Sequence, residues 1–523
     1  MRFLKTNYPK THTWKAAILL SILLLTQTST PTTSQEALPA YAFPKRELRG
    51  AWIATVHNID WPSRKFLSPE QQRNEFEEIV QSHKKTGINA LFVQVRTAAD
   101  AFYAIGNEPW SEWLTGEQGK PPYPIYDPLP FMIQTAHDKE MEFHAWLNLN
   151  RGTNKSSKSL HPNHPYYKHP EWFYTYDGHA IFNFGLPEVQ RYIIQVVQNI
   201  VKNYDVDGIH FDDYFYPYTI AGQTIPDEST FQKYGSGFAN IEDWRRHVVT
   251  TLIKDIASTI RTTKPWVKFG VSPFGVWRNQ DKDASGSPTN AGQTSYDNLY
   301  ADGLLWLKKG YIDYLAPQVY FSFESSKVPY ASLTSWWAKN SYGRPIYIGH
   351  ASYKVNPSSK EDGWDNPNQI SRQLSFNRQY QSIQGSIFFN TNSLKNNELG
   401  LRDKIQATYK HHALTPLMPW KGNFNPLPPK DIQAGFSKTN RLVIKWAPST
   451  NNVLEHHQYV IYKFLPTQKI DLNRAECIAD IVSGEQTNWQ DISGIYLPGT
   501  RYLITTLDRL QNESTRSKAI IIP

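Results

Sequence analysis

Residues 207–214 read Asp-Gly-Ile-His-Phe-Asp-Asp-Tyr, and the fold prediction starts from this stretch. Gly208–Asp213 has the length and the apolar content of a buried strand. Because side chains alternate along a strand, its two apolar side chains face one side, while His210 and Asp212 face the other. Asp213 then lies at the carboxyl end. A strand with polar groups on its inner side and at this end is typical of parallel α/β proteins.

Seven more short apolar stretches occur along the chain, separated by longer amphipathic stretches. This alternation is typical of a parallel sheet built from βαβ units. The eight predicted strands are Leu48–Thr55, Ala90–Arg96, Phe143–Asn148, Gly208–Asp213, Lys268–Ser272, Tyr314–Tyr320, Ile346–His350 and Ser386–Asn390. The helices between them are predicted at Pro69–Thr86, Pro187–Asn203, Ile241–Thr262, Asn298–Lys309 and Asn368–Ser382. Eight units in order favour a closed (β/α)8 barrel over an open doubly wound sheet, and no glycine-rich phosphate loop follows the first strand.

The pattern changes after the barrel. Residues 413–429 are rich in proline, which stiffens a chain and marks a boundary. Residues 430–523 carry shorter alternating strands, at Leu442–Trp446, Tyr459–Phe464, Thr487–Asp491 and Arg501–Leu507, which predict a small β-sandwich of the fibronectin type III kind. We therefore expect a signal peptide at 1–42, a barrel at 43–412, a linker at 413–429 and a sandwich at 430–523. Few contacts should cross the linker.

The N-terminus has the pattern of an export signal. Basic residues up to Lys15 precede the apolar run Ala16–Leu25, which is shorter than the roughly 20 residues of a membrane-spanning helix. The stretch 40–42, Ala-Tyr-Ala, is a candidate cleavage site. Because it lies far from the apolar run, an uncleaved anchor is the alternative. No cysteine follows the run, so we expect no lipoprotein anchor. The protein is expected in the periplasm, associated with the cell envelope, or secreted.

Composition narrows the possible partners. Of the 523 residues, 14% are aromatic, including 17 Trp and 30 Tyr, and their faces suit stacking on sugar rings. The net charge is +8, of which +3 lies in residues 1–42, and the mild positive charge that remains would hold the protein near an anionic polymer. No basic stripe suggests nucleic acid. The single cysteine, Cys477, excludes a disulfide within the chain and a cysteine-based zinc site. The spacing of His161, His164 and His169 does not favour zinc either. We expect no metal and no cofactor.

Polar and aromatic side chains point inward near the carboxyl ends of six predicted strands. An ordinary barrel interior would be Val, Ile and Leu, so this convergence predicts a functional site at that end. The inward positions are Gln94, Arg96, His144, Trp146, Asn148, His210, Asp212, Ser272, Gln318, Tyr320 and Asn390.

Hydrolysis of a glycosidic bond uses two carboxyl groups, one of them an acid kept protonated by burial or by a neighbouring negative charge. Asp212 is the main candidate, and a structural role for Asp213 is as plausible as a catalytic one. Since neighbouring side chains on a strand diverge, the partner should come from another loop. Asp100 and Glu324 are the available carboxylates, although Asp100 could instead cap its own loop and Glu324 could be solvated.

The remaining candidates would bind or orient the sugar, and Arg96 would also hold a carboxylate in its ionised form. These predicted substrate-binding residues are Arg96, Asn148, Arg151, His210, Tyr214, Trp277, Gln318 and Tyr320.

Seven segments in order resemble the bacterial glycosyl hydrolase-like 10 family, which includes a division-site enzyme acting on peptidoglycan strands. They are Glu47–Trp52, Asp60–Pro62, Val93–Arg96, His144–Asn148, Asp207–Tyr214, Gly270–Asn279 and Asp313–Tyr320. The resemblance implies a (β/α)8 barrel with glycoside hydrolase activity, and it puts Asp212 where related barrel glycosidases carry a strand-four carboxylate. The chain departs from the family at Thr97, where members usually have proline, and at residues 148–151, Asn-Leu-Asn-Arg instead of Asn-Pro-Tyr-Arg.

The sequence therefore predicts an exported glycoside hydrolase that cleaves a cell-envelope glycan, with peptidoglycan or a related polysaccharide as the expected substrate. The alternative is a non-catalytic glycan-binding or scaffold protein with a degenerate barrel site. The C-terminal module would serve as a spacer or contact the cell wall or another envelope protein. The linkage that is cut, the stereochemical outcome and the oligomeric state stay open at this point.

Overall fold

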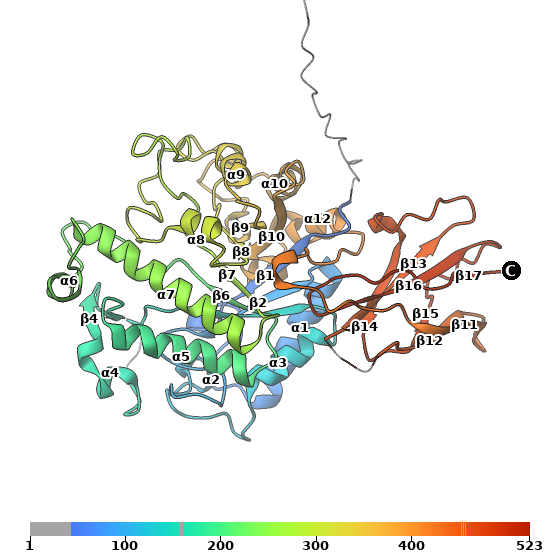
Figure 1. The fold of residues 1–523 in the computed structure, drawn as a ribbon, viewed down its shortest axis with the longest axis horizontal. Helices are drawn as coiled ribbons and strands as arrows, with labels where there is room; N and C mark the ends of the chain where they lie inside the picture. The colour runs from blue at the N-terminus through green and yellow to red at the C-terminus, as the bar shows by residue number, and fades with distance from the viewer. Residues whose placement is uncertain (1–42, 156–159, 451, 453, 456) are drawn as a thin grey trace, which may run out of the picture. The chain divides into compact units, whose positions relative to one another are not determined.

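Eight parallel strands close into a barrel (Figure 1). The computed structural model describes residues 43–155, 160–450, 452, 454–455 and 457–523, so the predicted signal peptide lies outside the described residues. Around the barrel the strands follow chain order, and the last pairs with the first. They are β1 (Leu48–Ile53), β2 (Ala90–Arg96), β3 (Glu142–Leu147), β6 (Gly208–Phe211), β7 (Lys268–Val271), β8 (Tyr314–Leu315), β9 (Ile346–Ala351) and β10 (Ile383–Phe389). The predicted barrel is confirmed.

The sixth strand is shorter than predicted. β8 ends at Leu315, two residues before Pro317, which has no N–H to donate to a ladder. Gln318 resumes the pairing through single bridges to Phe274 and Gly349 on the flanking segments. The chain therefore still runs along the barrel wall at the point where Gln318 approaches the mouth.

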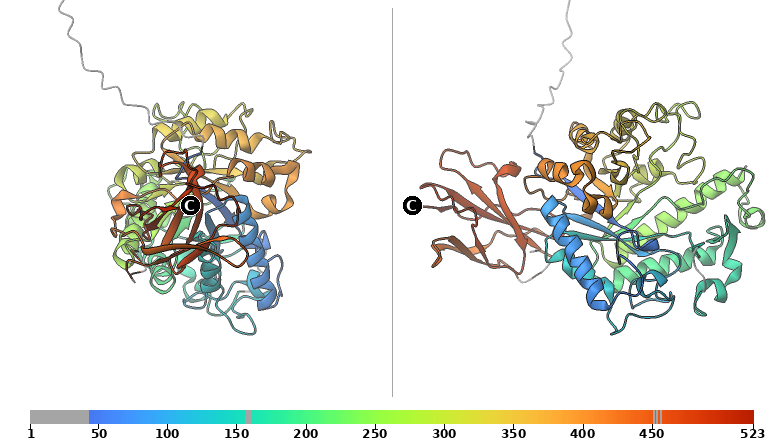
Figure 2. Two further views of the ribbon diagram at one scale, coloured as in Figure 1. Left: turned by 90° about the vertical axis from the view of Figure 1, so that its right-hand side faces the viewer. Right: turned by 180° about the vertical axis from the view of Figure 1, so that it is seen from behind.

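Helices surround the barrel, and local sequence explains their ends. Helix α1 (Pro69–Thr86) begins at a capping box between Ser68 and Gln71 and ends at Gly87, whose φ of 90° suits glycine. In Figures 1 and 2, α5 and α7 lie side by side on one flank. The α-helices beyond α1 are α2 (Glu112–Thr115), α3 (Pro128–His137), α4 (Pro165–Lys168), α5 (Pro187–Asn203), α6 (Glu228–Tyr234), α7 (Ile241–Thr263), α8 (Gly303–Lys309), α9 (Tyr330–Lys339), α10 (Gln369–Asn377), α11 (Thr391–Asn396) and α12 (Leu401–Thr408).

The long loop after β3 contains a hairpin that the sequence did not predict. Strands β4 (Phe173–Tyr176) and β5 (His179–Phe182) pair antiparallel. Asp177 and Gly178 join them with φ values of 50° and 72°, the Asp-Gly turn that favours a two-residue hairpin. The hairpin returns the chain to the barrel mouth, where Ile181 forms a bridge with Arg151.

The C-terminal residues form two antiparallel sheets that share a core (Figure 2). One sheet has the order β11-β12-β15 and the other β14-β13-β16-β17. Their bounds are β11 (Lys430–Phe436), β12 (Leu442–Ala447), β13 (Gln458–Phe464), β14 (Ile478–Ser483), β15 (Asn488–Gln490), β16 (Arg501–Leu507) and β17 (Ile520–Ile521). Trp446 and Trp489 from the first sheet pack with Tyr459 and Tyr502 from the second, so the module is a sandwich. Strands β11, β14 and β17 were not predicted.

Many contacts join this module to the amino-terminal end of the barrel. Arg46 donates to the carbonyl oxygens of Thr415 and Gln511, both at 2.9 Å. Arg509, on the module, pairs with Asp207 at 2.9 Å, and Asp207 directly precedes β6. The expectation of few contacts across the linker is wrong, because the prolines of this segment give no information about the charged groups on either side of it.

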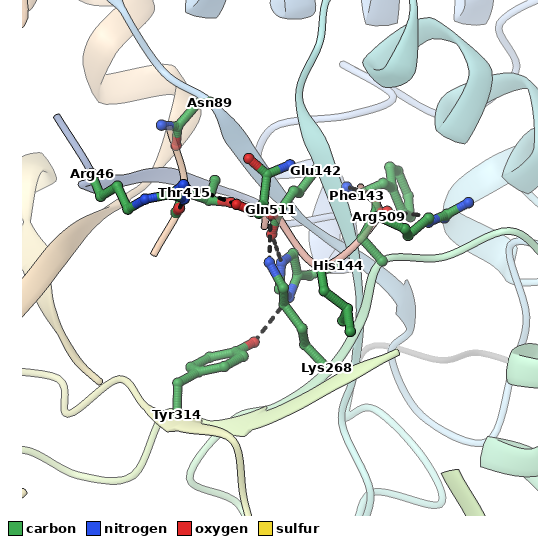
Figure 3. Close-up of polar contacts among 12 residues, drawn as sticks. Arg46, Asn89, Glu142, Phe143, His144, Lys268, Tyr314, Thr415, Arg509 and Gln511 are labelled. Carbon is green, nitrogen blue, oxygen red and sulfur yellow. Dashed lines mark hydrogen bonds and ion pairs between the residues drawn. The ribbon is translucent and has the colours of Figure 1, made fainter. Parts of the chain in front are cut away.

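A buried ionic cluster closes the barrel floor at this junction (Figure 3). Glu142 accepts a hydrogen bond from Thr415 at 2.5 Å, and its Oε1 lies 2.5 Å from the Nζ of Lys268. His144 lies 3.0 Å from Glu142 on one side and 3.0 Å from the Tyr314 hydroxyl on the other. Burial alone would raise the pKa of Glu142, but Lys268 and His144 lower it to about 2. The floor is therefore charged, and its charged groups are buried and paired with one another.

Two further observations apply to the described part of the chain. None of its helices is both long and apolar enough to cross a bilayer. It also contains no group of three or more His, Cys, Asp or Glu side chains placed to hold a metal ion.

Candidate active site

Asp212 lies at the carboxyl end of β6, at the mouth of the barrel, and is held in place by β3. Its Oδ2 accepts hydrogen bonds from Trp146 Nε1 at 3.0 Å and from Asn148 Nδ2 at 3.1 Å. Trp146 belongs to β3 and Asn148 directly follows it, so the pairing of β3 with β6 sets this geometry. Burial, and then the neighbouring charge of Asp213, raise the pKa of Asp212 to about 7. The carboxyl group of Asp212 can therefore hold a proton near neutral pH.

Asp213 turns toward the opposite side of the mouth. The hydroxyl of Tyr218 donates to its Oδ2, and the side chain of Gln318 also hydrogen-bonds to it. Burial raises the pKa of Asp213, while these two donors act in the opposite direction because they stabilise the ionised form. The two adjacent carboxyl groups therefore have different neighbours: Asp212 faces β3, and Asp213 faces the segment after β8.

A cation and an aromatic ring complete the site beside these carboxylates. The guanidinium of Arg151 lies 4.0 Å from the centre of the Tyr214 ring. Its positive charge lowers the pKa of both Asp212 and Asp213, which opposes the effect of burial. Burial, and then Asp213, raise the pKa of Tyr214 to about 12, so this phenol stays protonated. Arg151 is itself positioned by its backbone N–H, which donates to the Asn148 side chain at 3.1 Å.

Two acidic groups thus lie at the carboxyl end of a central strand, with tyrosines and an arginine around them. A family model described as glycosyl hydrolase-like 10 matches residues 47–366. The chain belongs to this family.

Relatives along most of the chain carry related names. The "Glycosyl hydrolase YngK" of Bacillus subtilis strain 168 is 42% identical over 486 residues, covering 92% of this chain and 94% of the relative. The "Glycosyl hydrolase DigH" of Escherichia coli K12 is 38% identical over 403 residues, covering 71% and 91%. Among solved structures, the catalytic domain of a β-amylase from Paenibacillus polymyxa aligns with a TM-score of 0.45 at 10% identity, covering 70% of this chain and 98% of that one.

Within this glycosyl hydrolase-like 10 barrel, several predicted residues do meet at the mouth. Gln318 and Tyr320 lie beside Asp213, and Gln318 Nε2 also donates to the carbonyl of Ser272 at 2.9 Å. Asn148, Arg151, Tyr214 and both aspartates join them. These residues come from the ends of β3, β6 and β8, as the strand pattern predicted.

The other predicted carboxylates are engaged elsewhere. Asp100 accepts from the backbone N–H groups of Thr97 and Ala98, both at 2.9 Å, which is the loop cap that the sequence allowed as an alternative. Glu324 is part of an exposed ion pair with Arg372 at 2.8 Å. Neither makes a hydrogen bond with Asp212 or Asp213 in the structure.

Three predicted sugar-binding residues are buried among protein groups. Arg96 forms a bidentate ion pair with Glu108, at 2.8 and 2.7 Å, so the carboxylate it holds is not one of the aspartates at the mouth. His210 lies one layer below Asp212, fully buried and 3.1 Å from the Tyr314 hydroxyl. Trp277 stacks on Trp336 in the outer core. Side-chain alternation identified the direction of Arg96 and His210 but not their depth, and Trp277 was proposed from the family resemblance alone.

Sequence reasoning missed a small cavity next to the mouth. It has a volume of 170 Å³ and is bounded by loop residues after β3 and β6. The available signal was the aromatic run at 214–218, Tyr-Phe-Tyr-Pro-Tyr, whose first and last members line the cavity. The other lining residues are Asn150, Arg151, Tyr176, Asp177, His179, Ile181, Pro217 and Ile220.

Proposed function

We propose that this protein is an exported glycoside hydrolase that cleaves a glycan of the cell envelope, peptidoglycan or a related polysaccharide. The observation that carries the proposal is the environment of Asp212. A carboxyl group with a pKa of about 7 can hold a proton at neutral pH and donate it to a leaving oxygen. Membership of a glycosyl hydrolase-like family supports the same reaction class.

The proposal assigns acid–base chemistry to Asp212 and makes Asp213 the second carboxyl group of the reaction. Both carboxyl groups lie at the barrel mouth, whereas Asp100 and Glu324 have partners of their own. Arg151 and Tyr214 offer a cation and an aromatic face to a sugar, and Asn148 holds the acid in place. The export part rests on the N-terminal sequence pattern, and the choice of envelope glycan rests on the family resemblance and the net positive charge.

The test is a panel of polymers incubated with the purified protein. Peptidoglycan strands stripped of their peptides, intact peptidoglycan and neutral polysaccharides are compared by the release of reducing ends. The proposal expects release from an envelope glycan, most rapidly from the stripped strands. Release from none of these polymers would favour the glycan-binding alternative.

A separate measurement tests export. Mass spectrometry of the protein produced in a bacterial host should give a mature chain that begins near Phe43, outside the cytoplasm. An intact N-terminus on a membrane-bound form would contradict the cleaved signal and support the anchor instead.

A further inference from the structure

We propose that the sugar cleaved at this site carries an acylamino group on C2, and that the carbonyl oxygen of this group is the nucleophile. This inference rests on the proposed function, because it concerns the same carboxyl groups and the same bond. It identifies a substrate class, the 2-acylamino sugars, and gives Asp213 a defined role.

The first observation is that neither Asp100 nor Glu324, the carboxylates expected as partners of Asp212, lies at the mouth. The charged groups that act most strongly on Asp212 are Asp213 and Arg151. Asp213 also raises the pKa of Tyr214, Tyr218 and Tyr320, and Asp212 contributes at Tyr214. The other two predicted carboxylates are engaged elsewhere, Asp100 with the backbone of Thr97 and Glu324 with Arg372. Of the predicted carboxylates, only the two adjacent aspartates therefore lie at the mouth.

The second observation is the direction of these two acids. A protein nucleophile and an acid must flank the glycosidic bond from opposite sides of the sugar ring. Asp212 and Asp213 instead come from neighbouring positions on one strand, one bonded toward Asn148 and the other toward Tyr218. This arrangement suits two neighbouring substituents of one sugar: the leaving oxygen on C1 and the amide nitrogen on C2.

The hydrogen-bond partners then distinguish the two roles. Asp213 accepts from Tyr218 and Gln318, which favours its carboxylate form, and an ionised carboxylate can accept the amide N–H of the substrate. Among the described residues, the hydrogen bonds to Asp212 come from Trp146 and Asn148 and both reach Oδ2, so the other oxygen is left to carry the proton.

Hydrolysis then takes two chemical steps. The acyl oxygen attacks C1 as the bond from C1 to the leaving oxygen breaks, and the proton of Asp212 passes to that oxygen. The result is a cyclic oxazolinium whose N–H is held by the Asp213 carboxylate. Water then attacks C1, giving its proton to Asp212, and the ring opens to restore the acylamino group. The net reaction is hydrolysis, with the configuration at C1 retained after two inversions.

The small cavity provides the third observation. Tyr218, whose hydroxyl bonds Asp213, also lines this cavity together with Tyr214. Ile181, Pro217 and Ile220 contribute apolar surface to it. The cavity has a volume of 170 Å³ and is joined to Asp213 through Tyr218, although neither aspartate lines it. Its apolar walls suit the outer end of a short acyl group.

The experiment compares three preparations of the same peptide-free peptidoglycan strands: untreated, chemically de-N-acetylated, and de-N-acetylated then re-acetylated. We expect kcat/KM to fall by at least about 100-fold on de-N-acetylation, because the nucleophile is removed, and to recover on re-acetylation. NMR of the first product should show the same anomer as the substrate. A thiazoline analogue of the cyclic intermediate should compete with the strands for the wild-type enzyme.

The outcomes separate this inference from the proposed function. Equal rates on untreated and de-N-acetylated strands, or a product of inverted configuration, would overturn the acylamino mechanism and leave a glycan hydrolase. Absence of cleavage from all three preparations and from every polymer of the panel would overturn both proposals. Asp213→Asn gives a second readout: kcat on untreated strands should fall at least about 100-fold, with thiazoline binding weakened as well.

Discussion

At the residue scale, Asp212 combines a position that follows from sequence with a chemistry that does not. Alternation along Gly208–Asp213 correctly placed it inward at the barrel mouth. Its pKa, however, depends on burial and on Asp213, and its orientation on Trp146 and Asn148 of another strand. These are contacts between segments distant in the chain, which a single sequence does not reveal.

The raised pKa of Asp212 makes a prediction about stability. Its pKa rises from 3.8 to about 7 on folding, so the folded state binds this proton more tightly than the unfolded chain. The resulting stabilisation is complete below about pH 4 and is lost as the pH rises through 7. Asp212→Asn removes this titration. Melting temperatures of both proteins should therefore differ increasingly in favour of the variant between pH 4 and pH 8. A difference that is constant with pH would mean that Asp212 titrates normally.

Asn150 gives a second prediction at this scale. It is 1% exposed, lines the small cavity, and neither atom of its side-chain amide has a hydrogen-bond partner among the described residues. Since replacing an unpaired buried polar group by an apolar one of similar shape is neutral or stabilising, Asn150→Leu should melt at or above the wild-type temperature.

The matched control is Asn183→Leu. Asn183 is also buried and lies in the same long loop between β3 and α5. Its side chain, however, donates to Thr230 at 2.7 Å and accepts from Gly185 at 3.1 Å. Its replacement should lower stability by about 1–3 kcal/mol. If Asn150→Leu loses as much, the Asn150 amide has a structural partner.

At the scale of elements, the barrel strands and three of the five predicted helices were predicted well, whereas α8 and α10 are shorter than predicted and the structure inside the long loops was missed. Helices α1 and α5 have the predicted bounds because proline starts and amphipathic spacing mark them. The hairpin of β4 and β5 was missed because each of its strands has only four residues, too few for a clear alternating pattern. The only clear signal of the hairpin in the sequence is the turn Asp177-Gly178. The same holds for the site. The sequence located the residues at the strand ends, but it did not reveal roles that depend on a partner in a loop, such as the pairing of Arg96 with Glu108.

Glu108, in the loop after β2, joins Arg96 at the end of β2 to Tyr192 of α5. The stability of this loop should therefore depend on the charge of Glu108. Glu108 is bonded by Arg96 and by the Tyr192 hydroxyl at 2.8 Å, and both charged side chains are buried. Glu108→Gln leaves an uncompensated guanidinium and should cost about 3–5 kcal/mol in the free energy of unfolding. The double variant Arg96→Met/Glu108→Leu, measured by the same denaturant titration, should cost less than the single one. A double variant that is the less stable of the two would show that the pair itself stabilises the fold.

At the scale of the whole molecule, the C-terminal module also completes the barrel floor. Removing residues 413–523 leaves Glu142 without Thr415 and Asp207 without Arg509. The fragment 43–412 should therefore unfold at a lower temperature than the chain 43–523 by scanning calorimetry. Arg509→Met in the full chain should reproduce part of this loss. Equal melting temperatures of the fragment and the full chain would mean that the C-terminal module does not stabilise the barrel.

The central claim is that Asp212 carries out the chemistry of a glycan hydrolase, and one paired measurement tests it. Reducing-end release from peptide-free peptidoglycan strands is compared between wild type and Asp212→Asn, with the folded fraction of each checked by its melting curve. Asn preserves the shape of the side chain but cannot donate or accept the proton. The account predicts a loss of at least about 100-fold in rate, roughly 3 kcal/mol in the barrier, with a melting temperature equal to or above that of wild type. A variant that melts much lower, yet retains wild-type activity per folded molecule, would contradict it.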